Sequence, residues 1–193
     1  MAELTRESLM SLEEYHAARP AFRKEVMAHK KNRQVPIGPN ATLYFEDEKT
    51  MRYQVQEMLR IEKIFDPEGI QEELDAYNPL IPDGSNWKAT FMLEFPDPEE
   101  RRQRLADLIG IEKKTWVQVG DMDKVYPVAN EDLERETEDK TSSVHFMRFE
   151  LTPDMVEAAK QGAPVKMGID HDNYRHEVSV PENVRASLVE DLD

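Results

Sequence analysis

The sequence predicts an α+β protein, with a helical first part followed by a region built on β-strands. Three observations predict it. Apolar residues recur at helical spacing over residues 50–65, they alternate with polar residues over 87–95, and a turn signal at 82–85 separates the two patterns. We therefore expect a mostly helical region at residues 1–82 and a sheet region at 83–193, which can also pack together as one compact domain.

The first helix is expected to begin at Ser11, because Ser11 and Glu14 have the spacing of a capping box. Pro20 is expected to interrupt this helix or to begin a new one, which then ends in a run of basic residues. The segment 35–40 is rich in proline and glycine and predicts a break between elements. A short strand is expected at 42–45.

A strong helix is expected over residues 50–65, because its apolar residues form a broad stripe at the helical period. Asp66 and Pro67 then predict the cap and first turn of another helix, which ends before Asn78. The helical region therefore ends shortly before the turn at 82–85.

The sheet region is expected to contain two similar strand–helix–hairpin units, at residues 83–140 and 141–193, with Phe91 and Phe146 in matching places. The strands of both units are expected to form one mixed sheet with helices on one face. The first unit is expected to hold a strand at 87–95, a helix closed by Gly110, a hairpin at 116–119 and 125–128, and a short helix capped by Asn130. The second is expected to hold a strand at 143–151, a helix ending near Gly162, a hairpin at 165–169 and 174–180, and a last helix from Pro181.

Composition excludes several classes of function. The chain has 25 Lys and Arg against 40 Asp and Glu, a net charge of −15, which disfavours binding to nucleic acid and to anionic membrane surfaces. It has no cysteine, so it cannot form disulfides, thiolate nucleophiles or iron–sulfur clusters of its own. Phosphate-binding glycine loops and common hydrolase motifs are missing. We find no signal peptide or membrane span and expect a cytoplasmic protein.

Four residues are candidates for a metal site. Glu62 is expected to project into the apolar stripe of the helix at 50–65, where a carboxylate is costly unless it is paired or bound. His145 is expected on the apolar face of a strand, and His171 and His176 flank the turn of the last hairpin. Together they could bind a transition metal such as Fe, Zn or Mn. The alternative is a Glu62 paired with an arginine, one buried hydrogen-bonded histidine and two surface histidines.

Several long segments resemble a bacterial family, domain-of-unknown-function family 3501. The resemblance lies in the stretches 53–65, 73–86, 138–141, 149–151, 168–171 and 175–177, which span nearly the whole chain. It supplies no established catalytic residues. It implies a part in redox or peroxide handling, beside rubrerythrin-like and iron–sulfur oxidoreductase proteins.

Three functions follow from these observations. The first is an accessory or binding protein, whose acidic surface docks a rubrerythrin-like or iron–sulfur redox partner. The second is a metal- or haem-dependent enzyme with a His/carboxylate site. The third is a structural subunit of a homo-oligomer, whose sheet edges are completed by another copy of the chain. Whether the protein is an enzyme stays open at this point.

Overall fold

Six α-helices and eight β-strands follow one another in a computed structural model that describes all of residues 1–193. The helices are α1 (Leu12–Lys30), α2 (Glu48–Glu62), α3 (Pro67–Tyr77), α4 (Pro98–Asp107), α5 (Pro153–Lys160) and α6 (Glu182–Val189). The strands are β1 (Gln34–Ile37), β2 (Ala41–Glu46), β3 (Asn86–Leu93), β4 (Thr115–Val119), β5 (Val128–Ala129), β6 (Val144–Glu150), β7 (Val165–His171) and β8 (Tyr174–Ser179). Short 3₁₀ helices lie at Arg6–Ser8, Asn78–Leu80 and Ile111–Lys113. The α+β class is thus confirmed.

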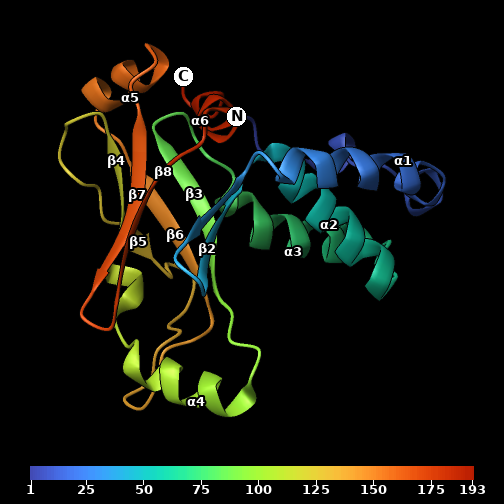
Figure 1. The fold of residues 1–193 in the computed structure, drawn as a ribbon. Coiled ribbons are helices and arrows are strands. Elements are labelled where there is room, and N and C mark those ends of the chain that lie inside the picture. Colours follow the sequence, from blue (N-terminus) through green and yellow to red (C-terminus); the bar gives the residue numbers. More distant parts are fainter.

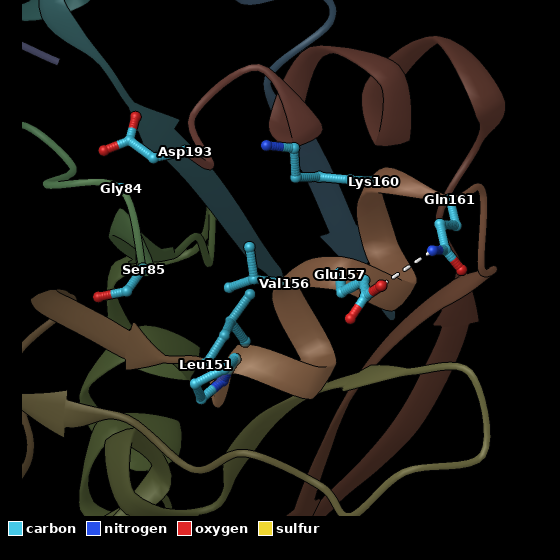
Figure 2. A pocket seen from close by; sticks show the side chains of 9 residues that line it. Gly84, Ser85, Leu151, Val156, Glu157, Lys160, Gln161 and Asp193 are labelled. Atoms are coloured by element: carbon cyan, nitrogen blue, oxygen red, sulfur yellow. Dashed lines mark hydrogen bonds between the residues drawn. The ribbon is translucent and has the colours of Figure 1, made fainter.

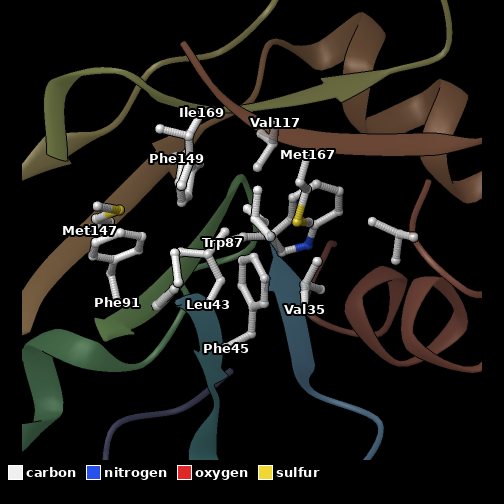
Figure 3. Packing of buried hydrophobic residues seen from close by; sticks show 14 of the residues in the cluster. Val35, Leu43, Phe45, Trp87, Phe91, Val117, Met147, Phe149, Met167 and Ile169 are labelled. Atoms are coloured by element: carbon white, nitrogen blue, oxygen red, sulfur yellow. The ribbon is translucent and has the colours of Figure 1, made fainter. Parts of the chain in front are cut away.

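The strands form two antiparallel sheets, which corrects the expectation of one mixed sheet. The larger sheet has the order β1-β2-β3-β6-β5 and the smaller β4-β7-β8. Their apolar faces enclose the main core, where Trp87 and Phe149 of the larger sheet lie opposite Val117 and Met167 of the smaller (Figure 3). The pairing of β3 with β6, which are far apart in sequence, decides this arrangement, and no local pattern encodes it.

The two predicted units correspond to β3-α4-β4 and β6-α5-β7-β8, and their matching strands pair with each other. The second hairpin forms between β7 and β8 as predicted. The first does not form as a ladder, because only Val125 bridges to Val117, while β5 joins β6. The helix expected after Asn130 is also not formed. The internal duplication stays a prediction.

Helices α1, α2 and α3 form a layer of their own beside the larger sheet (Figure 1). Six buried residues make the small core of this layer: Leu4, Met51, Val55, Leu59, Leu74 and Ile81. The predicted capping box at Ser11 is confirmed by mutual bonds between Ser11 and Glu14. None of the helices of the chain is both long and apolar enough to cross a bilayer.

Two expectations about proline were wrong. Helix α1 runs through Pro20 without a break, since Tyr15 on one side of it and Val26 on the other are fully buried and hold both halves in place. The segment expected to be a break at 35–40 begins with strand β1, in which Pro36 is tolerated because β1 is the edge of its sheet. The chain then turns at Gly38, which has φ +72°.

A buried ion pair joins the segment that follows α1 to the segment that follows α6, the last helix. Arg33, only 2% exposed, directs Nη1 and Nη2 to the two carboxylate oxygens of Asp191 at 2.9 and 2.7 Å. It also donates to the carbonyls of Phe45, Glu46 and Ser187 at 3.0–3.2 Å. Burial raises the pKa of Asp191 to about 6, although Arg33 opposes the rise. At neutral pH the two side chains therefore form a charged pair across the fold.

Candidate functional site

His145 lies on strand β6 and is fully buried, and both of its ring nitrogens make hydrogen bonds. Asn130 donates to Nδ1 at 2.8 Å, and the Asn130 amide is oriented by the backbone N–H of Phe146, which donates to its oxygen. Nε2 lies 3.0 Å from the carbonyl of Ser142 and 2.8 Å from the hydroxyl of Thr141. Burial lowers the pKa of His145, which favours the neutral ring. Because Asn130 donates to Nδ1, the ring proton lies on Nε2 and is donated to the carbonyl of Ser142.

The other three candidate metal ligands do not gather around His145. His171 donates from Nε2 to the carbonyl of Ile109 at 2.8 Å, and His176 packs on the ring of Tyr174. Glu62 is exposed, since α2 ends there. In the whole chain no group of three or more His, Asp or Glu side chains is placed to hold a metal ion. The metal site stays a prediction without a converging set of ligands.

On helix α2, the glutamate that pairs with an arginine is Glu57 rather than Glu62. Its oxygens accept from Nε of Arg19 at 2.9 and 3.2 Å. Sequence periodicity placed Glu62 in the apolar stripe because it assumed that the helix continues to Phe65, but Lys63 adopts a left-handed conformation and ends it. Phe65 is consequently 80% exposed.

The carboxyl group of Glu112 lies near His145. Glu112 is only 4% exposed, its Oε2 has no hydrogen-bond partner, and this atom lies 4.0 Å from Nε2 of His145. Burial, reinforced by the charge of Glu136, raises the pKa of Glu112. Glu136 itself accepts from the backbone N–H of Gly110 at 2.8 Å. The buried carboxyl of Glu112 is thus biased toward its neutral form.

A cavity of about 760 Å³ is an open depression beside α5 (Figure 2). Its wall carries Glu157, Lys160 and Gln161 from α5 and its end, and Gln161 donates to Glu157 at 3.1 Å across one helical turn. Leu151 and Val156 are the two hydrophobic residues of its lining. A depression this open to solvent encloses little of a ligand's surface, so it is a poor ligand site in spite of its volume.

A better candidate lies between the larger sheet and the helical layer. Two cavities, of about 550 and 410 Å³, share Tyr77, Leu80 and Phe146, and we call them together the sheet–helix groove. The first is lined by Lys30, Arg33, Gln34, Tyr44, Phe45, Glu46, Thr50, Met51, Gln54, Tyr77, Leu80, Thr90, Met92, Val144 and Phe146. The second adds Asp75, Ala76, Pro79, Lys88, Glu131, Asp132, Met147 and Arg148.

The groove exists because the larger sheet is covered on both faces. Its inward residues pack against the smaller sheet, and its outward residues on β2, β3 and β6 meet the helical layer. Tyr44, Met92 and Phe146 are such outward residues, and they are half-buried rather than exposed. Helix α2 contributes Met51 and Gln54 to the opposite wall. The result is a concave site with apolar walls and a few polar groups, the usual form of a ligand pocket.

Glu46, at the end of β2, is the carboxylate of the first cavity. The hydroxyl of Thr50 donates to Oε2 at 2.6 Å, and that of Thr90 donates to Oε1 at 3.1 Å. Burial raises the pKa of Glu46, and the two hydroxyls partly oppose the rise. The carboxyl is therefore held in one position by α2 and β3, and its environment favours the protonated form more than water does.

Sequence reasoning missed this groove. The alternation over residues 87–95 predicts a half-buried strand, with Thr90 and Met92 on the face away from the core. A signal was present, because Met92, Val144 and Phe146 are apolar residues at outward positions of their strands. Such residues indicate a second covering layer. The polar residue Glu46 gave no signal, since its burial depends on a helix that packs there only in the folded chain.

Comparisons with known proteins agree with this fold. The chain matches a crystal structure of a novel protein of unknown function from Burkholderia pseudomallei, with a TM-score of 0.94 and 52% identity over 100% of both chains. Among curated proteins none matches. The model of the family "Protein of unknown function (DUF3501)" matches residues 3–192. The resemblance drawn from the sequence is thus confirmed, and the chain belongs to the DUF3501 family.

Proposed function

We propose that the protein is a binding protein that takes a small amphipathic ligand in the sheet–helix groove. The observation that carries this proposal is the pairing of apolar walls with one fixed, half-buried carboxyl, Glu46. Apolar walls supply binding energy without direction, and a fixed polar group orients the ligand. The groove presents no nucleophile–base pair and no set of metal ligands, so binding is the chemistry that its residues support best.

The test uses Nile red, a flat uncharged dye whose fluorescence rises in apolar surroundings. Titration of the protein should give saturable binding at one site. Met92→Lys places an ammonium group on the floor of the groove, and it should weaken dye binding by about tenfold or more, because the charge would be desolvated by the ligand.

Phe65→Lys is the matched control, since it makes the same change of charge at an exposed aromatic residue that does not line the groove. It should leave dye binding unchanged. If Phe65→Lys abolishes binding and Met92→Lys does not, the dye binds at the exposed turn after α2, and the groove is not the site.

The accessory role expected from the family resemblance remains a second proposal. The net charge of −15 supports the docking of a basic partner, and a rubrerythrin-like or iron–sulfur redox protein is the partner to test. Affinity capture with the intact chain at low and high salt would test it, since association steered by charge weakens as salt rises. Capture that is independent of salt would contradict docking by the acidic surface.

A further inference from the structure

The Glu46 carboxylate is only partly supplied with hydrogen-bond donors. Each of its oxygens accepts one bond, from Thr50 and from Thr90. An ionised carboxylate has about four acceptor positions, so roughly half of its capacity is unused by the protein. The remaining acceptor positions of this half-buried carboxyl are free for a proton or for a donor from a bound molecule.

The nearby cations do not neutralise Glu46. Arg33 directs its guanidinium to Asp191 and to three backbone carbonyls, one of them the carbonyl of Glu46, and not to the Glu46 carboxylate. Lys30 holds its ammonium 5.4 Å from the centre of the Tyr53 ring. It favours the ionised form of Glu46 only at a distance, because Glu46 takes part in none of the ion pairs of the structure.

Aromatic and thioether side chains line the same cavity as this carboxyl. Tyr44 and Phe146 line the sheet side, Met51 lines the helix side, and Tyr77 lies where the two cavities meet. Aromatic faces attract cations, and they also stack on flat apolar groups. The surroundings therefore suit a molecule that combines a positive charge with a flat apolar body.

We infer that the groove recognises amines, with the ligand's ammonium group bound at Glu46 and its flat apolar body between Tyr44, Phe146 and the helical layer. This inference rests on the proposed function and names the class of ligand. The ammonium would donate to the unused acceptor positions of the carboxylate, and such charge-assisted bonds are stronger than neutral ones. The natural competitor of the ligand is a proton, because burial raises the pKa of Glu46.

Three indoles with one ring system and different charge give a direct test: tryptamine is cationic, 3-ethylindole is neutral, and indole-3-propionate is anionic. Each is used to displace Nile red from the wild-type protein at neutral pH. Tryptamine should displace the dye at a concentration about tenfold lower than either analogue. Equal displacement by tryptamine and 3-ethylindole, or preferred displacement by indole-3-propionate through Lys30, would overturn the inference.

Glu46→Gln provides the second arm, since it keeps the shape of the side chain and removes its charge. In this variant the three indoles should displace the dye equally. Glu177→Gln is the control, because it removes the same charge at an exposed position of β8, in the smaller sheet and outside the groove. An advantage of tryptamine that survives Glu46→Gln, or that disappears equally in Glu177→Gln, would contradict binding at Glu46.

The two levels of the proposal fail in different ways. If Nile red does not bind, or binds with equal strength when Met92 is replaced by lysine, the binding function of the groove is wrong. If the dye binds in the groove but the wild type shows no preference for the amine, the function stands and only the inferred ligand class is wrong. The wild-type comparison needs no variant, so it gives a result even if Glu46→Gln does not fold.

Discussion

Replacement of Arg33 by methionine should be among the most destabilising single changes in this protein. The guanidinium is 2% exposed and serves both oxygens of Asp191, which is 1% exposed, together with three carbonyls. Methionine fills a similar length but leaves these acceptors without donors. Breaking a buried ion pair from one side costs about 3–5 kcal/mol, so we expect a loss of about 4 kcal/mol in the free energy of unfolding.

Urea unfolding followed by tryptophan fluorescence measures this loss, because Trp87 and Trp116 are both buried and report the folded core. The double variant Arg33→Met with Asp191→Leu should recover about 2 kcal/mol of the loss, since it no longer leaves a carboxylate alone in the core. Arg102→Met is the control, because Arg102 and Glu99 form an exposed pair, and it should cost less than about 0.5 kcal/mol.

The reasoning is refuted if Arg33→Met costs less than about 1 kcal/mol, or if the double variant is less stable than the single one. The first result would mean that water replaces the guanidinium at little cost. The second would mean that the packing of the Asp191 side chain, rather than its charge, holds the last helix in place.

Two further predictions concern other buried groups. Burial and Glu136 raise the pKa of Glu112, so the stability that Glu112 contributes is present below its unfolded pKa and is lost as pH rises through its folded pKa. Glu112→Gln should therefore gain stability relative to wild type as pH rises above 4.5, the ordinary pKa of a glutamate, in urea unfolding, and a difference that does not change with pH would contradict this. Gly168→Ala should lower the free energy of unfolding by about 1–3 kcal/mol in the same assay, because its Cβ would come within 2.4 Å of the Trp116 ring and 2.8 Å of a backbone oxygen; an unchanged value would show that Trp116 can move aside.

Local signals in the sequence predicted individual elements well. The capping box at Ser11, the cap at Asp66 followed by proline, and the alternation that marks β3 all depend on residues within a few positions of one another. Pro20 is an exception. Proline disfavours the interior of a helix, but burial of α1 on both sides of Pro20 outweighs this preference. Local chemistry is thus readable from the sequence, except where distant packing overrides it.

The assembly of the elements was less predictable. The strands could form one mixed sheet or two sheets that face each other. Which of these forms depends on contacts such as those between β3 and β6, whose paired residues are more than fifty positions apart. The candidate site also depends on contacts between residues that are distant in sequence. His145 was correctly expected on a buried face, but its partners Asn130 and Thr141 come from a loop that has no periodic pattern. Glu46 is a candidate only in the folded chain, where Thr50 of α2 and Thr90 of β3 fix its carboxyl group.

The two separate hydrophobic clusters imply that the molecule does not open as one unit. The core of the helical layer has six buried residues, whereas the main core between the two sheets, which we call the sandwich, has 28. In native-state hydrogen exchange, amides of α3 should therefore exchange through openings of lower free energy than amides of β3 and β6. A ligand held between the layers would slow exchange in the helices while leaving the central strands almost unchanged. The stiff sandwich would then act as a platform, and the helical layer as the part whose motion governs the entry and release of the ligand.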